Sequence, residues 1–216
     1  MTDTGDRSVT GETPARRRGR RAGTSDTRAA IVDAARTRFA EDGYDRASLR
    51  SIARAASVDA ALVHHYFADK ADLFVAAMHL PLRPHEIVGR VIAGDRDALG
   101  ERLVGTFFGV WDSPLGRESI RALLRGAVSH DAAARMLREF LTREVFGKLA
   151  IAVSAPDADL RGALVASQMV GLAVTRYIIR LEPIASAPTS DLVAWIGPTV
   201  QRYLTADSPN GGTQGS

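Results

Sequence analysis

Apolar residues recur every three or four positions along most of the chain, which is the spacing of helices that bury one face. In the first such segment Ile31, Ala35 and Phe39 lie four residues apart, and the pattern predicts an amphipathic helix of about four turns. Gly43 predicts the end of this helix, because glycine readily adopts the left-handed conformation that terminates many helices. Tyr44 follows directly, where its ring can pack back on the helix.

Two short helices are predicted next, separated by a three-residue turn. Ser48 can cap the first, over residues 49–56, and Asp59 can cap the second, over residues 60–66. Helices of about two turns with this spacing are typical of a helix-turn-helix, whose second helix enters the major groove of DNA. The side chains of the second helix that are expected to face outward are those of Ala60, Ala61, His64 and His65.

The helical spacing continues along the chain after Pro81 and Pro84, which end a fourth helix. The further predicted helices span residues 86–92, 98–111, 118–128, 132–153, 159–181 and 190–204. No segment alternates apolar and polar residues as a half-buried strand would, so the predicted fold class is all-α. The predicted organisation is a helix-turn-helix domain over residues 25–80, a helical domain over 81–206, and disordered ends at 1–24 and 207–216.

Composition places the chain among globular proteins and removes several kinds of chemistry. The 216 residues are 45% hydrophobic, enough for a core, and include no cysteine, which excludes disulfide scaffolds, thiolate zinc sites and thiol catalysis. The start of the chain has no apolar stretch of secretory length, so a cytoplasmic location is expected. The longest apolar region, residues 163–179, is short and interrupted by polar residues, and we expect no membrane span there.

The positive charge is concentrated in the first 24 residues. The net charge of the chain is +3, and residues 1–24 carry six arginines against three acidic residues, which is the whole excess. The arginines that cluster there are Arg16, Arg17, Arg18, Arg20 and Arg21. This leader is interpreted either as a solvated tail or as an arm that lies along a phosphate backbone or in a minor groove.

The run SLRSIARAASVDAALVHHYFADKADLF, which begins at Ser48, resembles the DNA-binding domain of TetR-type (tetracycline-repressor-like) transcriptional regulators. The resemblance covers residues 25 to about 80 and includes the Ile52-Ala53 pair, the aromatic end of the recognition helix and Lys70 in the next helix. It implies a sequence-specific DNA-binding regulator, most simply a repressor.

Two departures from the family pattern affect how DNA would be read. Ser57 stands where relatives commonly have glycine in the turn, and Ala60 and Ala61 stand where many relatives carry polar or basic residues. Alanine offers only methyl contacts to bases, so specificity would fall on His64, on the leader and on DNA shape.

The residues expected to contact DNA, besides the leader arginines, are Ser48, Arg50, Ala60, Ala61, His64, His65, Tyr66 and Lys70. Several have a plainer alternative: Ser48 as a helix cap, Arg50 as a solvated charge, and Tyr66 as part of the domain core. Lys70 lies in the first turn of its helix, where the helix dipole disfavours a cation, and a phosphate partner would explain it. Adjacent histidines cannot share one helix face, so no metal site is expected at them.

The resemblance further implies that the last two long helices form a four-helix interface with a second copy of the chain. Such a two-fold dimer would carry two recognition helices to successive major grooves of a near-palindromic operator. The residues expected at this interface are Ala163, Ala166, Ser167, Val170, Gly171, Val174, Trp195, Val200 and Tyr203. The alternative is that both helices are ordinary core helices.

The resemblance also implies that the middle helices enclose a pocket for a small apolar or amphipathic effector. The residues expected to line or anchor it are Phe107, Phe108, Trp111, Arg121, Arg125, His130, Met136 and Phe140. Ordinary core packing is the alternative for each. The implied mechanism is a population shift, in which the effector favours a dimer that no longer matches the groove spacing.

An enzymatic function is not expected. The chain contains no phosphate-binding, dinucleotide-binding, zinc-protease or nucleophile-elbow motif, and its other histidines have no evident catalytic partners. No cofactor is therefore predicted. The remaining alternative is a DNA-binding factor without an effector, which acts through a protein partner or as an architectural protein.

Overall fold

A computed structural model of the chain describes residues 24–153 and 157–207. The five clustered leader arginines, Arg16 to Arg21, and residues 208–216 of the predicted tail lie outside the described residues. Within the described part the secondary structure is helical and contains no strand, so the all-α prediction is confirmed.

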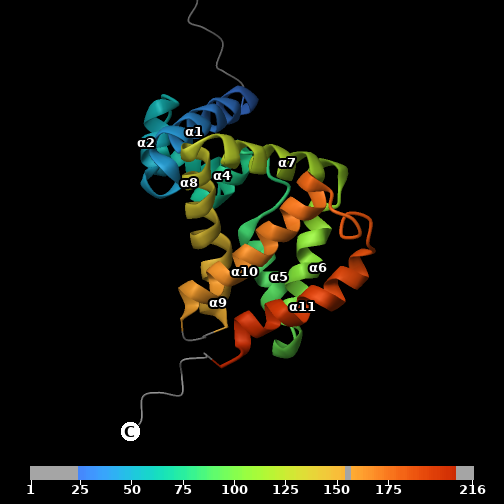
Figure 1. Ribbon diagram of the computed structural model, residues 1–216. Helices are drawn as coiled ribbons and strands as arrows, with labels where there is room; N and C mark the ends of the chain where they lie inside the picture. The colour runs from blue at the N-terminus through green and yellow to red at the C-terminus, as the bar shows by residue number, and fades with distance from the viewer. Residues whose placement is uncertain (1–23, 154–156, 208–216) are drawn as a thin grey trace, which may run out of the picture.

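The helices follow the predicted order. The N-terminal helices are α1 (Thr24–Arg46), α2 (Leu49–Ala55), α3 (Ala60–Tyr66) and α4 (Lys70–Ala77). The C-terminal elements are α5 (Pro84–Ile92), η1 (Arg96–Ala98), α6 (Leu99–Trp111), α7 (Pro114–Ser129), α8 (Asp131–Phe140), η2 (Leu141–Phe146), α9 (Gly147–Ala152), α10 (Ala158–Ala173), η3 (Val174–Ile179) and α11 (Thr189–Thr205). The N-terminal helices gather at one end of the molecule, and α8 runs away from them along the C-terminal part (Figure 1).

The first helix bends where glycine predicted its end. Gly43 has a φ of 82°, a conformation that L side chains rarely adopt, and α1 is two helical pieces joined across it. This bend turns Tyr44 back so that its ring stacks on Phe39, with the ring centroids 5.8 Å apart. Phe74 of α4 completes the cluster edge-on to both rings. The three buried aromatic rings hold α1 and α4 together.

Two predicted long helices each contain a π-helical turn. The segment predicted as one helix over 132–153 is α8, the π-turn η2 and α9, and the segment over 159–181 is α10 followed by the π-turn η3. The helix predicted from residue 118 begins earlier, at Pro114. This earlier start has a local cause. The Ser113 hydroxyl accepts a hydrogen bond from the Gly116 amide at 3.0 Å, and proline is favoured in the first turn of a helix.

Helices α6 and α11 cross at two glycines. A Cβ atom added to Gly100 would meet the carbonyl oxygen of Gly197 and would lie 2.6 Å from the backbone nitrogen of Gln201. A Cβ on Gly197 would in turn lie 2.8 Å from the Glu101 side chain. The side-chain oxygen of Gln201 accepts a hydrogen bond from the Gly100 amide at 2.8 Å, so the close crossing also satisfies a backbone N–H group. Together these contacts fix α11 against α6.

One helical stretch, Ala158–Ile179, is long and apolar enough to cross a membrane by length and composition, with 22 residues and a mean hydropathy of 1.4 over an 18-residue window. The prediction that this region is too short is wrong, because the helix begins before the apolar run. The stretch nevertheless carries a buried arginine: Arg161 donates to the carbonyl oxygens of Tyr203 at 2.9 Å and Ala206 at 2.7 Å. These bonds tie it to the end of α11.

Candidate functional site

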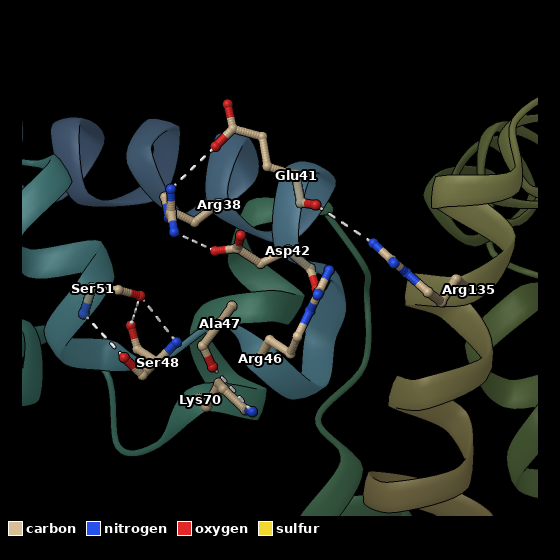
Figure 2. A network of polar contacts seen from close by, with 9 residues as sticks. All are labelled: Arg38, Glu41, Asp42, Arg46, Ala47, Ser48, Ser51, Lys70 and Arg135. Atoms are coloured by element: carbon tan, nitrogen blue, oxygen red, sulfur yellow. Dashed lines mark hydrogen bonds and ion pairs between the residues drawn. The ribbon is translucent and has the colours of Figure 1, made fainter.

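The helix-turn-helix begins with a capping box. The Ser48 hydroxyl accepts a hydrogen bond from the Ser51 amide at 3.1 Å, and the Ser51 hydroxyl accepts one from the Ser48 amide at 3.1 Å (Figure 2). Asp59 caps α3 in the same manner, with its carboxylate accepting from the Ala61 amide at 2.7 Å. Both predicted caps are confirmed, and each satisfies an amide that would otherwise lack a partner at a helix start.

The turn between these helices has the backbone conformation that favours glycine. Ser57 has a φ of 55°, in the left-handed region. Its position lets the Val58 amide reach back to the Ala53 carbonyl oxygen at 3.0 Å and close the end of α2. The departure from glycine noted in the sequence therefore has a physical cost, because a side chain in this conformation is disfavoured.

The recognition helix α3 presents few groups to solvent. Ala61, His64 and His65 are exposed, as predicted. Ala60 is half-buried and packs against the core, so it faces outward only in part. Tyr66 is also half-buried against the core, and its ring lies edge-on to His65 at 5.1 Å between centroids. The exposed face of α3 is thus one methyl group and two imidazoles.

The two remaining basic residues predicted to contact DNA differ in whether they already have partners inside the protein. Arg50 on α2 is exposed. Lys70 donates from Nζ to the carbonyl oxygens of Tyr44 at 2.9 Å, Ala47 at 3.3 Å and Asp45 at 3.4 Å. Its charge also lies 4.3 Å from the centroid of the Tyr44 ring, and burial lowers the pKa of the ammonium group.

A phosphate partner is therefore not needed to explain Lys70, and its contact with DNA stays a prediction. Three carbonyl oxygens and an aromatic face inside the protein explain a cation at this helix start. Figure 2 shows the lysine reaching from α4 toward Ala47, beside the start of α2. These hydrogen bonds link α4 to the end of α1 and to the residues just before α2.

The N-terminal helices are fastened to α8 and η2 by an aromatic and polar joint. Phe74 of α4 stacks on Phe140 of α8, with ring centroids 4.3 Å apart. The Tyr44 hydroxyl donates to Glu144 at 2.7 Å, and burial together with this bond raises the pKa of the phenol. Arg143 pairs with Asp45 at 2.6 Å. Helix α8 and the π-turn η2 therefore contact the aromatic core of the N-terminal helices directly.

A second polar link lies along the same seam. Arg135 of α8 donates to the Glu41 carbonyl oxygen at 3.5 Å, and Figure 2 shows its side chain extended across the gap toward α1. Next to it on α1, Arg38 forms ion pairs with both Asp42 and Glu41.

The C-terminal helices enclose an apolar cavity of about 90 Å³. Its walls come from α5, α6, α7, α8, η2 and α10. Three predicted residues line it: Phe107, Trp111 and Phe140. Much of the wall was not predicted from the sequence, including Leu137, Leu141, Val145, Phe146 and Met169. The apolar spacing of the 132–153 segment marked most of these positions as buried, but not which neighbours they would face.

The other predicted lining residues lie elsewhere, and those predictions are wrong. Met136 and Phe108 are buried in packed parts of the core and do not border the cavity. Arg125 and His130 are exposed. Arg121 does not border the cavity and donates to the Tyr177 carbonyl oxygen at 3.1 Å. None of the described residues that line the cavity is charged.

Phe108 lies against a polar cluster that was not predicted from the sequence. The Arg176 guanidinium lies 5.1 Å from the Phe108 ring centroid and pairs with Asp112 at 3.2 Å. It also donates to the Ile184 carbonyl oxygen at 2.7 Å, which holds the loop before α11. The Tyr177 hydroxyl donates to the same carboxylate at 2.8 Å, and burial raises the pKa of this phenol too.

An exposed apolar face runs along α10 and η3 and across to α11. Of the predicted interface residues, those that are exposed are Ala163, Ser167, Val170, Gly171 and Trp195, and those that are half-buried are Ala166, Val174 and Tyr203. Val200 is 0% exposed within the single chain, so its assignment to an interface is wrong. Leu160, Leu164, Ile178 and Ile179 extend the exposed face. Trp195 is 82% exposed, which is unusual for so large an apolar side chain.

A helix-turn-helix with capped helices, joined to a helical body that holds an apolar cavity, is the architecture of a DNA-binding transcription regulator. A model of bacterial regulatory proteins of the tetR family matches residues 31–77, and a model of the tetracyclin repressor-like C-terminal domain matches residues 97–204. A TetR-family regulator from Streptomyces coelicolor A3 is 40% identical over 86% of this chain and 98% of that chain, with a TM-score of 0.46. The protein therefore belongs to the TetR family of transcription regulators.

Other solved structures are more distant. NalD, the secondary repressor of the MexAB-OprM multidrug efflux pump in Pseudomonas aeruginosa, is 20% identical over 86% of this chain and 100% of that chain, with a TM-score of 0.46. The multidrug-binding protein EbrR, solved with proflavin, is 20% identical over 82% of this chain and 99% of that chain, with a TM-score of 0.44. Among curated proteins no match is found.

Proposed function

We propose that the protein is a cytoplasmic repressor that binds a near-palindromic operator as a homodimer and is released by a small-molecule effector. In this proposal residues 25–80 form the DNA-binding domain and residues 81–206 the effector-binding and dimerisation domain. The observation that carries it is the double position of Phe140, which borders the apolar cavity and stacks on Phe74 of α4. A ligand that displaces Phe140 would disturb the helices that position α3.

DNA contact is proposed for the exposed groups of the helix-turn-helix and for the leader. Arg50 and the two imidazoles of α3 are free of ion pairs among the described residues, and Ala61 offers a methyl group to thymine. The folded part carries no net positive charge, with 22 basic and 22 acidic residues after residue 24. The leader arginines therefore supply the non-specific electrostatic attraction.

Homodimerisation through α10 and α11 is supported by the exposed apolar face. Leu160, Leu164 and Trp195 remain exposed in the single chain, and Gly171 leaves open space above its backbone. Burial of large apolar side chains contributes about 1.5–3 kcal/mol each, so a self-complementary contact along this face would be stable.

The dimer proposal is tested by sedimentation equilibrium of the Leu164→Glu variant. We expect the wild type to sediment as a dimer and the variant as a monomer that retains its helical circular dichroism. Val128→Glu, at another exposed apolar position on α7, serves as the matched control and should remain dimeric. A dimeric Leu164→Glu protein would contradict the proposed interface.

The regulatory proposal is tested by sequencing genomic fragments that the purified protein captures. One palindromic site near a single gene is the expected result. Capture of many unrelated sequences with similar affinity would contradict it.

The alternative, an effector-independent factor, is favoured by one observation. The cavity of about 90 Å³ is far below the roughly 300–1,000 Å³ of sites for drug-sized ligands. A screen of small apolar and amphipathic compounds against the protein–operator complex separates the two functions. Release by a compound supports the repressor, and retention under all compounds supports the alternative.

A further inference from the structure

The apolar cavity adjoins an open groove between α5 and α6. The groove has a volume of about 570 Å³ and is bordered by Arg90 and Arg102, by the glycines Gly105 and Gly109, and by Pro81. Thr106 and Val110 line both the groove and the cavity. These two side chains of α6 therefore form the boundary between the apolar cavity and the basic groove.

The cavity wall determines which part of a ligand can enter. Its lining side chains are apolar apart from the Thr106 hydroxyl and the indole nitrogen of Trp111. A polar or charged group buried there without partners would cost several kcal/mol in lost hydration. Only an apolar body of modest size fits, and its polar end must lie at the Thr106 boundary.

The groove determines which polar end is favoured. Its lining residues include two arginines and no carboxylate among the described residues. Arg102 is held in place, because its guanidinium donates to the carbonyl oxygens of Val91 at 2.9 Å and Asp95 at 2.5 Å. Arg90 is more exposed and reaches Glu86 only at 4.0 Å, so its guanidinium is available for a second anion.

We propose that the effector is an amphipathic anion, a small monocarboxylate whose short alkyl chain or single ring enters the cavity and whose carboxylate lies in the groove beside Thr106, Arg90 and Arg102. This inference rests on the proposed function, because it names the ligand class for the same cavity. Entry between α5 and α6 places the apolar end against Phe107 and Trp111.

The two tryptophans provide a direct assay without DNA. The chain contains two, Trp111 on the cavity wall and the exposed Trp195, so the Trp195→Phe variant leaves a single fluorophore at the site. In this background we expect octanoate to change Trp111 fluorescence with saturation, 1-octanol to bind more weakly, and octylammonium to bind most weakly. Equal affinity for the three probes, or binding of none, would overturn the proposal.

Charge variants locate the carboxylate. Arg90→Gln should raise the Kd of octanoate about three- to fivefold at low salt, as expected for an exposed charge, and leave the Kd of 1-octanol unchanged. Arg83→Gln is the matched control, because Arg83 lies as close to Glu86, at 3.9 Å, but outside the groove. Equal effects of the two variants would overturn the groove assignment.

Thr106→Val tests the boundary itself with a side chain of the same shape. We expect weaker binding of octanoate and 1-octanol with an unchanged unfolding midpoint, and unchanged binding would overturn the role of Thr106. Operator release is measured separately. Octanoate that binds with this dependence but releases no operator would support the site and contradict the proposed function. Release by a compound that does not compete with octanoate would support the function and overturn the proposed ligand class.

Discussion

The N-terminal and C-terminal helices differ in how completely they bury their large apolar side chains. In the described chain up to Val91, every large apolar residue is at least partly covered, and the core closes around Phe39, Tyr44 and Phe74. Among the described residues from Ile92 onward, eleven large apolar residues are exposed, and this part supplies most of the walls of the cavity. The first part buries its large apolar residues in a closed core. The second leaves apolar surface around the cavity and on the outside of the chain.

This difference suits two kinds of work. A DNA reader acts through the placement of a few exposed groups, so its core must hold α2 and α3 rigidly. A part that binds a ligand and a second copy of the chain needs apolar surface that the single chain does not cover. Phe140 belongs to both parts, because it borders the cavity and stacks on Phe74.

The largest effect is expected from Phe74→Ala, which removes a fully buried ring at the joint. We expect a loss of about 3–5 kcal/mol in the free energy of unfolding, since a large buried side chain leaves a cavity. Urea unfolding followed by circular dichroism measures it. Trp195→Ala, which truncates an even larger but exposed ring, should cost less than about 0.5 kcal/mol at concentrations where the chain is monomeric. Similar losses for both variants would refute the contrast between closed and open regions.

A pair of glycines on α6 tests whether the C-terminal part is loose throughout. Gly100→Ala places a methyl group against the α11 backbone and should lower the free energy of unfolding by about 1–3 kcal/mol. Gly105→Ala, on the same helix with no atom within 4 Å of the added Cβ, should raise it by about 0.5–1 kcal/mol. Thermal unfolding of both variants decides the point, and a tolerated Gly100→Ala would show that α11 can move on α6.

The pH dependence of the free energy of unfolding allows a tyrosine at the joint to be compared with one inside the C-terminal part. The pKa of Tyr44 is raised above its ordinary value of 10.0, so the folded chain keeps this phenol protonated where the unfolded chain ionises. The resulting stability is present below about pH 10 and is lost as the pH rises further. Tyr44→Phe should therefore flatten the alkaline loss by about 1.4 kcal/mol per pH unit.

Tyr177→Phe should flatten the alkaline loss to the same extent, because burial and Asp112 raise the pKa of Tyr177 in the same direction. Urea titrations between pH 8 and about pH 11.5 measure the slopes. At pH 7 only the Tyr44→Phe variant should weaken the link between α1 and η2, at a cost of about 1 kcal/mol for the lost bond to Glu144. An alkaline slope that neither variant changes would contradict both assignments.

The smallest effect is expected in the turn of the helix-turn-helix. Ser57→Gly should raise the free energy of unfolding by about 0.5–1 kcal/mol, because glycine adopts a φ of 55° without the penalty of a side chain. Ser57→Val should lower it. If the glycine variant is less stable than the wild type, the turn strain inferred from the backbone is absent.

The elements that the sequence determined are those fixed by neighbours in the chain. Asp59 caps α3 and Gly43 bends α1 through contacts within a few residues, and α3 spans the predicted residues 60–66. The joint, the cavity and the exposed apolar face were not determined in this way. Lys70 reaches carbonyl groups 23 to 26 residues away, and Arg176 reaches Asp112 across 64 residues.

Val200 is a second example of a residue whose partner could not be predicted from the sequence. Its helical spacing marks an apolar face, but only the glycine crossing of α6 and α11 decides that this face is already covered within the chain. Periodicity tells which residues avoid water, because that preference belongs to each side chain. Tertiary structure decides which partner covers them, because packing depends on the shapes of surfaces that are far apart in the sequence.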